Sequence, residues 1–409
     1  MNGLKELGDT MLSARTSHLR VRDGHAHARV TFVELFFDLV FVFAVTQLSH
    51  GLLEHLTPLG ALQTAVLALA IWWAWIDNAW LTNWLDPERA AVRILLFVIM
   101  FGALIVAAAI PKAFADRGLI FGLAFGITSF APKPFMLWAL HRHDANNFRN
   151  FVRITVWRAA GAACWIAGGF LSPEQRLAVW GLALAIDTGS PLVGFYVPGL
   201  GRSTTADWTV EGGHLAERCA LFVIIGLGES VLITGATFAG LPWSDVNVAA
   251  FANAFAGSVA MWVVYFNIGE RRSTHLAATS TDPGRLARSG YTYMHIPIVA
   301  GIIVAAVGDE LVLHHPGGHT DAKTAIVLIA APALYLLGNS LFKWLSAPYA
   351  PLSHTVGLGL LTALGLLVWL VHDIPPLALS AATTAVLILV AVWEWVSIGR
   401  SAKPPAGNA

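Results

Sequence analysis

Apolar stretches long enough to cross a membrane dominate the pattern of this 409-residue chain. A helix rises about 1.5 Å per residue, so about 20 apolar residues cross a bilayer core of about 30 Å. The stretches cover residues 30–53, 59–84, 89–110, 117–140, 149–171, 174–197, 213–237, 246–268, 287–309, 322–345, 353–371 and 376–397. The sequence therefore predicts an all-α polytopic membrane protein with about twelve transmembrane helices, ten being the alternative count.

Proline marks several of the predicted boundaries. Asp86 followed by Pro87 indicates a helix cap and a first helical residue, which would start the third span. Pro173 opens the sixth span in the same way, and Pro375 separates the eleventh span from the twelfth. Pro132, with a second proline two residues later, predicts a kink or a break inside the fourth span.

The distribution of lysine and arginine predicts the orientation in the membrane. If the N-terminus is cytoplasmic and the spans alternate, eighteen of the 25 basic residues fall in cytoplasmic segments and four outside. This asymmetry matches the positive-inside rule and favours cytoplasmic termini, a basic segment at 1–29 and a tail at 398–409. Residues 1–29 lack the apolar core of a cleavable signal, so the first span is expected to direct insertion.

Similarities between the two parts of the chain favour an internal duplication. Residues 70–78 align with residues 259–267, and further matches follow in the same order. The collinear order favours two six-helix halves in the same membrane orientation, 30–198 and 213–397, joined by a cytoplasmic linker at 199–212. The alternative is that apolar helices resemble one another by composition alone.

Composition excludes several classes of function. Charged residues make up 12% of the chain, whereas a soluble domain has about 25%. The formal net charge is zero, which indicates no nucleic-acid partner. Cys164 and Cys219 both lie in apolar stretches and predict no disulfide framework. No zinc-peptidase, phosphate-binding or nucleophile-elbow motif occurs, so we expect neither an enzyme nor a cofactor.

A histidine cluster lies in a predicted outer loop. His314, His315 and His319 lack a helical register, and no matched fourth ligand accompanies them. Solvated loop histidines explain this pattern better than a metal site does. The sequence therefore predicts no metal centre.

Charged residues inside the apolar spans are the candidates for function. A carboxylate at mid-membrane costs roughly 2.5–3.5 kcal/mol on insertion scales, and less near the ends of a span. Glu34 and Asp38 lie one helical turn apart on one face of the first span. Asp77 and Asn78 lie among four tryptophans in the second span. Charges this costly indicate partners or a wet cavity.

The seventh predicted span carries a second group of polar residues. His214, Arg218 and Glu229 share roughly one helical face, and Glu217 lies to one side. Glu229, followed by Ser230, could bind a cation or a proton. The equal alternative is a neutral, hydrogen-bonded Glu229.

Two interpretations of these embedded groups stay open. The first is a polar vestibule or ion pathway formed by Glu34, Asp38, Asp77, Asn78, His214, Glu217, Arg218, Glu229 and Ser230. It predicts that the carboxyls of Glu34, Asp38, Asp77 and Glu217 approach one another. The second is a set of ion pairs that fix helix packing, such as Asp38–Arg158 or Glu217–Lys133. Lys133, Arg158 and Asp187 are the predicted structural members of such pairs.

Three motifs resemble one known family. They are VELFFDLVFVFAVTQ at 33–47, WWAWIDNAW at 72–80, and HLAER at 214–218 followed by GES at 228–230. Over roughly residues 25–400 the chain resembles the bacterial low-temperature-requirement A (LtrA) family. The resemblance implies a polytopic protein of the bacterial inner membrane linked to growth in the cold. The motif positions coincide with Glu34, Asp38, Asp77, His214, Glu217, Arg218 and Glu229.

A second resemblance concerns the first span alone. Residues 37–46 are similar to the first helix of a potassium-channel family built from six-helix repeats and marked by Phe-Ser-Asp. Phe37 stands where that family has serine, and no such motif occurs at Leu221. This resemblance implies a channel as an alternative function.

The sequence favours a secondary transporter or a proton- or cation-coupled permease that uses buried carboxylates between two helix repeats. The first alternative is a cation channel lined by the acidic face of the first span. The second is a non-transporting scaffold or lipid-related factor for cold adaptation. The expected partners are membrane lipid and a small ion or solute, and the sequence allows a homo-oligomer.

Overall fold

The computed structural model describes residues 17–20, 29–141, 143–269, 282–346, 351–371 and 373–401. Within these ranges the chain is helical apart from the connecting loops and two isolated β-bridges. Ten of the described helices are long and apolar enough to cross a membrane. The predicted all-α polytopic membrane fold is therefore confirmed.

Two long helices of the sequence prediction are not among these ten. α7 (Ala145–Gly169) carries arginines in its first half, and α8 (Pro173–Gly189) has 17 residues. They correspond to the predicted spans at 149–171 and 174–197. The count of twelve spans, like the duplication, stays a prediction.

The protein consists of two compact units, and each is described by itself. The first unit comprises Met1–Gln47, Leu62–Arg218 and Thr281–Ala287. Its helices are most of α2 (Phe32–Glu54) and α3 (Pro58–Trp84), then α4 (Ala90–Ala109), η1 (Ile110–Lys112), α5 (Gly118–Phe130), α6 (Pro132–Leu140), α7, α8, η2 (Thr205–Asp207), the start of α9 (Gly212–Ala239) and α12 (Pro283–Leu286).

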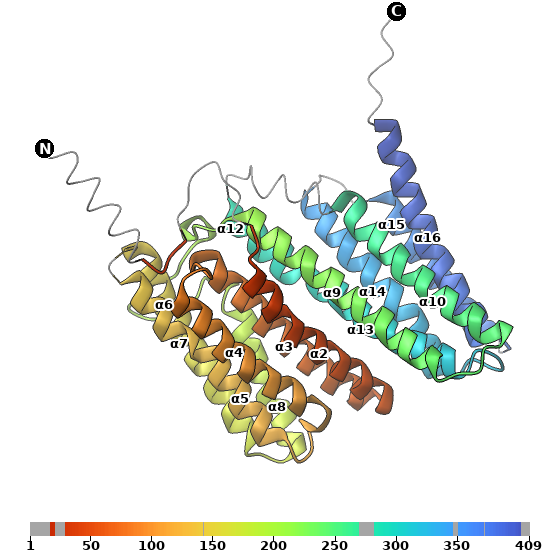
Figure 1. Cartoon of the computed structure of the whole chain (residues 1–409), viewed down its shortest axis with the longest axis horizontal. Helices are drawn as coiled ribbons and strands as arrows, with labels where there is room; N and C mark the ends of the chain where they lie inside the picture. The colour runs from red at the N-terminus through yellow and green to blue at the C-terminus, as the bar shows by residue number, and fades with distance from the viewer. Residues whose placement is uncertain are drawn as a thin grey trace, which may run out of the picture. The chain divides into compact units, whose positions relative to one another are not determined.

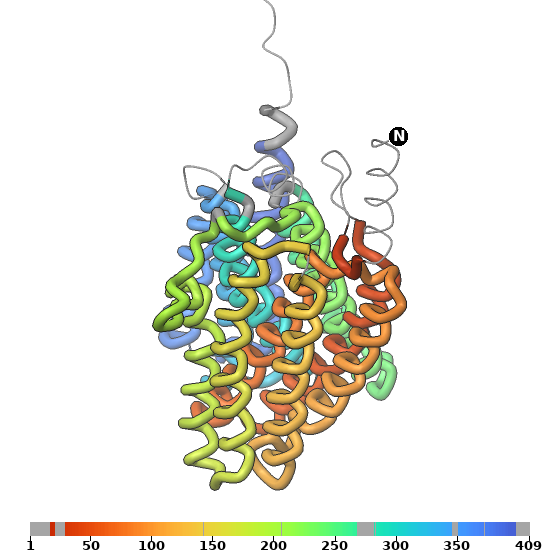
Figure 2. The backbone as a smooth tube through the Cα atoms, turned by 90° about the vertical axis from the view of Figure 1, so that its left-hand side faces the viewer, coloured from red at the N-terminus to blue at the C-terminus, as the bar shows by residue number. Residues whose placement is uncertain are grey.

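Within the first unit, α5 packs against α4 and α7, and α7 also packs against α6 and α8 (Figure 1). Small residues permit this close approach: a Cβ atom on Gly122 would lie 2.5 Å from the carbonyl oxygen of Trp165. Phe121, Phe125 and Trp180 surround Trp165. Figure 2 shows the yellow helices of this unit lying side by side.

The second unit comprises Leu48–Ala61, Cys219–Ser280 and Arg288–Ala409. Its helices are the end of α2, the start of α3, the rest of α9, α10 (Asp245–Val264), the π-helical turn η3 (Tyr265–Gly269), the π-helical η4 (Ala287–Tyr293), α13 (His295–His314), α14 (Ala322–Ser346), α15 (Leu352–Leu370) and α16 (Pro376–Ser401). α13 packs against α14, and α10 packs against α16. Gly301 and Gly338 lie where the α13 and α14 backbones approach each other, since a Cβ atom on either glycine would lie 2.7 Å from a backbone nitrogen of the other helix.

Outward-facing positions carry large apolar side chains, as a lipid-facing surface requires. On α4, the exposed fractions of Ile94 and Phe101 are 63% and 64%. On α15 and α16, Trp369 and Trp395 are also largely exposed. In water such faces would be unfavourable, so they support the membrane assignment.

The proline predictions are confirmed at three boundaries. α5 ends at Phe130 and α6 begins at Pro132, which is the predicted break. Pro173 is the first residue of α8, and Pro376 is the first residue of α16. The predicted cap at Asp86 is wrong, because α4 begins at Ala90, and the Asp86 carboxylate instead accepts a hydrogen bond from the Glu88 N–H within the preceding turn.

Candidate functional site

Glu34 lies at the start of α2 and is almost fully enclosed. Thr31 and Glu34 form the spacing of a capping box, and the Thr31 N–H and hydroxyl both donate to Glu34 Oε2 over 2.9 Å. Arg20 Nη2 donates to the same oxygen over 3.1 Å. His214 Nε2 lies 2.9 Å from Glu34 Oε1. Glu34 therefore both caps a helix and joins an acid–imidazole pair.

The Asn83 side chain contacts His214, and the Thr82 backbone carbonyl binds Arg20. Asn83 near the end of α3 exchanges two hydrogen bonds with the Glu211 backbone, and its amide nitrogen lies 3.4 Å from His214 Nδ1. Arg20 Nε donates to the Thr82 carbonyl over 2.7 Å. The backbone beside Arg20 pairs with the residue that follows α3 through a β-bridge. The segment before the first span thus becomes part of the cluster.

Asp38 lies two turns inside α2 and is completely buried. Its Oδ1 accepts a hydrogen bond from Trp75 Nε1 and another from Arg218 Nη2, both over 2.8 Å. The Arg218 guanidinium also lies over the Trp75 ring, 5.5 Å from its centroid. Asp38 Oδ2 and the Nε and Nη1 of Arg218 are buried without a hydrogen-bond partner. The pair is bonded on one side only.

Asp77 belongs to a second cluster that connects α3, α6, α7 and α8. Lys133 Nζ donates to Asp77 Oδ2 over 2.6 Å, and Arg158 Nη2 donates to Asp77 Oδ1 over 3.0 Å. Arg158 Nη1 continues the chain to Asp187 Oδ1 over 2.9 Å, and Trp165 Nε1 donates to Asp187 Oδ2. Two acids and two bases form a neutral, linear chain of ion pairs in the order Lys133, Asp77, Arg158, Asp187.

A third cluster lies in the second unit. Lys343 Nζ donates to both carboxylate oxygens of Glu394, over 2.9 and 2.8 Å, and to the Val264 carbonyl. His354 lies 3.4 Å from both groups. The cluster connects the ends of α10 and α14 with α15 and α16.

The remaining sequence-predicted residues lie as follows. Asn78 donates its amide to the Ala74 carbonyl one turn earlier. Glu217 Oε2 accepts a hydrogen bond from the Val30 N–H over 3.2 Å. Glu229 and Ser230 are both buried in the second-unit part of α9.

A family model described as "Bacterial low temperature requirement A protein (LtrA)" matches residues 29–392.

The chain belongs to the LtrA family.

One LtrA-like relative is an uncharacterised protein of Rhizobium meliloti (strain 1021). It is 39% identical over 395 residues, which cover 95% of this chain and 94% of the relative. No solved structure matches the chain. The family match includes all twelve embedded residues that the sequence singled out.

Two pairings suggested for this LtrA chain are wrong. Asp38 pairs with Arg218, not Arg158, and Lys133 pairs with Asp77, not Glu217. The four carboxyls that were predicted to approach one another do not share one hydrogen-bond network. Asp77 bonds to Lys133 and Arg158 in the second cluster. Partner choice follows the packing of α6, α7 and α8, which spacing along a sequence does not reveal.

Several important residues of the LtrA chain were missed. Arg20 was counted only as a cytoplasmic charge, although it reaches Glu34. Trp75 is one of the four tryptophans of the second span and has no sequence signal of its own, although its Nε1 donates to Asp38. Glu394 and Asp309 could have been found from the sequence, because each is an acid within an apolar stretch. Glu394 lies in the twelfth predicted span and Asp309 at the end of the ninth.

Proposed function

We propose that this chain is a proton- or cation-coupled secondary transporter of the bacterial inner membrane, with Asp38 and Arg218 as the coupling pair. One observation carries the proposal. Both groups are buried in membrane-spanning helices, yet Asp38 Oδ2 and two guanidinium nitrogens of Arg218 have no hydrogen-bond partner. Buried polar atoms of this kind are rare in proteins and mark positions where a bound group or a change of state satisfies them.

The chemistry of the pair suits coupling. When a proton or a cation binds the Asp38 carboxylate, the attraction to Arg218 weakens and the guanidinium becomes available to an anionic group. When the carboxylate is free, the ion pair re-forms. Ionisable groups inside membrane helices commonly form such relays in transporters.

The Glu34–His214 pair lies one turn from Asp38 on α2 and supports the same proposal. Histidine exchanges protons near neutral pH more readily than other side chains do. With Arg20 alongside, the pair offers a second proton position toward the start of α2 and α9. The substrate would be a small ion or solute, and the distribution of basic residues supports cytoplasmic termini.

Transport by the purified full-length chain tests the proposal. Proteoliposomes loaded with a pH-sensitive dye are given an outward Na⁺ or K⁺ gradient, and the internal pH is recorded. We expect the wild-type protein to let the cation out in exchange for protons, so that the internal pH falls. Asp38→Asn should lose this activity. Glu88→Gln, which changes an exposed loop acid, should behave as wild type.

Two outcomes would contradict the proposal. One is a pH trace identical to that of empty liposomes under both gradients. The other is full activity in Asp38→Asn. Unitary currents in a planar bilayer would instead favour the channel alternative.

A further inference from the structure

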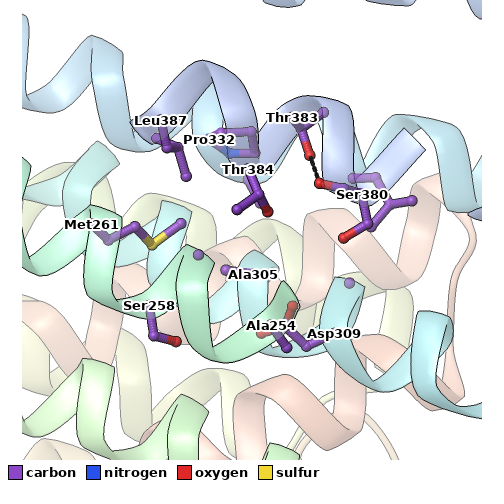
Figure 3. A pocket seen from close by; sticks show the side chains of 14 residues that line it. Ala254, Ser258, Met261, Ala305, Asp309, Pro332, Ser380, Thr383, Thr384 and Leu387 are labelled. Atoms are coloured by element: carbon purple, nitrogen blue, oxygen red, sulfur yellow. Dashed lines mark hydrogen bonds between the residues drawn. The ribbon is translucent and has the colours of Figure 1, made fainter. Parts of the chain in front are cut away.

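A small cavity lies among α10, α13, α14 and α16 of the second unit, and no residue of the third cluster lines it. Its volume is about 40 Å³, and one water molecule needs roughly 10–15 Å³ measured in the same way. Gly257, Ala305 and Gly308 line it, and these small residues leave the space open. Figure 3 shows Asp309 of α13 and Thr384 of α16 on its wall.

Asp309 is unlike the other embedded acids that form the clusters. Asp38, Asp77 and Glu394 each form a salt bridge with a lysine or arginine. Among the residues that the structure describes, no basic side chain forms a salt bridge with Asp309. A carboxylate in a membrane helix is costly without a positive partner. The cavity beside it provides the place for one.

Hydroxyl groups beside Asp309 and on the cavity wall supply oxygen atoms. The Ser230 hydroxyl lies beside the carboxyl, and its oxygen is buried without a well-formed hydrogen bond. The Thr384 hydroxyl faces α10, since a Cβ atom on Gly257 would lie 3.5 Å from it. Ser258 of α10 also lines the cavity.

A proline adds a backbone oxygen to this set. Pro332 lies inside α14 and lines the cavity together with Leu328. Because proline has no N–H, the Leu328 carbonyl loses its usual helical hydrogen bond, which makes it a candidate ligand. A proline inside a membrane helix is tolerated where other groups satisfy the freed carbonyl.

We propose that this cavity is a binding site for one Na⁺ ion. A single carboxylate balances one positive charge, and hydroxyl and carbonyl oxygens are ligands for hard cations. The small volume excludes organic cations. Asp309 lies five residues before the end of α13, about 7.5 Å along the helix axis, so the ion would enter from that end of the unit.

Equilibrium binding of ²²Na⁺ to the purified full-length chain in detergent at pH 8 tests this site. We expect saturable binding and a rise in melting temperature of about 2 °C or more with NaCl but not with choline chloride. Asp309→Asn should reduce bound ²²Na⁺ to background. Thr384→Val removes one ligand and should weaken the affinity about tenfold.

Glu310→Gln is the matched control, because Glu310 follows Asp309 on α13 but does not line the cavity. It should bind as wild type. Binding that survives Asp309→Asn, or an equal melting shift with KCl, would overturn the sodium assignment. If Asp309→Asn does not fold, unchanged affinity in Thr384→Val overturns it. The assay uses no gradient, so the result is independent of transport through Asp38.

Discussion

At the scale of the residue, Asp38 and Arg218 stabilise each other in a place where neither is stable alone. The effective penalty for burying an ion is several kcal/mol. The Trp75 N–H and the stacking of Arg218 over the Trp75 ring offset part of it. The two side chains therefore act as one energetic unit, and changing one should harm the protein more than changing both.

A double-mutant cycle measures this coupling. Arg218→Leu leaves Asp38 as an uncompensated buried charge, which should cost about 3–5 kcal/mol of stability. Adding Asp38→Asn removes that charge, so the double variant should be more stable than Arg218→Leu alone. Denaturation in detergent, followed by tryptophan fluorescence, gives both values. Destabilisations that simply add would show that the pair is not coupled.

The sequence predicts which charges are embedded but not which partners they find. Glu34, Asp38 and Arg218 stand out because charge is rare in apolar stretches, and this signal is local. The partner of each charge depends on which helices are neighbours, and the partners predicted for Asp38 and Lys133 were wrong. Arg20 was missed because a basic residue before a first span normally lies in water.

At the scale of the element, α7 shows how a helix with three arginines fits among apolar neighbours. Gly161 allows Asp187 of α8 to reach Arg158, because a Cβ atom at Gly161 would lie 2.5 Å from Asp187 Oδ1. The position of one glycine thus permits the bond that ties α7 to α8 and, through Asp77, to α3.

Alanine at this glycine should therefore destabilise the first unit. Gly161→Ala pushes Asp187 away from Arg158 and should lower the apparent melting temperature in detergent. Gly181→Ala on α8 is the matched control, since no atom lies within 4 Å of its added Cβ. Gly181→Ala should be neutral or stabilising by about 0.5–1 kcal/mol. Equal effects of both substitutions would contradict the packing argument.

The start of α14 gives a pH dependence. Hydrogen bonds from the Thr324 side chain and N–H lower the pKa of Asp321, which lies in the loop before the helix. This stabilisation is complete above the unfolded pKa of about 3.9. It disappears as the pH falls through the lower folded value. Melting temperatures between pH 6 and pH 3 should fall less steeply for Asp321→Asn than for wild type. Parallel curves would exclude a contribution from Asp321.

Helix boundaries were predictable where proline decides them. Pro132, Pro173 and the prolines after 374 set their ends through their missing N–H and fixed backbone angle. The helix cap predicted at Asp86 was wrong because an aspartate before proline is as common in a turn as at a helix cap. Here the turn forms, and α4 starts later at Ala90.

At the scale of the whole molecule, α7 and α8 decide the number of membrane spans. α7 carries three arginines, one of which is paired with Asp187 inside the first unit, and α8 has only 17 residues, so neither belongs to the ten long apolar helices. α7 has 25 residues, enough for about 37 Å of helix. We expect both helices to cross, which would place the turn between them outside the cell.

A single cysteine in that turn decides the question. Ser172→Cys, in a chain with Cys164 and Cys219 replaced by alanine, should react with a membrane-impermeant maleimide on intact cells. His319→Cys marks the outer side under either count, and Thr209→Cys marks the inner side. Labelling of Ser172→Cys only after the cells are opened would support ten spans.

Composition was enough to predict a polytopic helical membrane protein, because hydrocarbon selects apolar helices of fixed length. The Asp309 cavity was not predictable, since its walls come from helices far apart in sequence. Asp309 also sits near the end of its span, where an acid attracts little notice. The internal duplication stays a prediction.

The contact between Arg20 and Glu34 has a practical consequence for anyone preparing this protein. The family match begins at residue 29, which invites a truncation there. Such a shortened chain would lack the guanidinium that bonds Glu34 and the strand-like segment that pairs with Leu85. Purification handles therefore belong at the C-terminus, and the first thirty residues should be left intact.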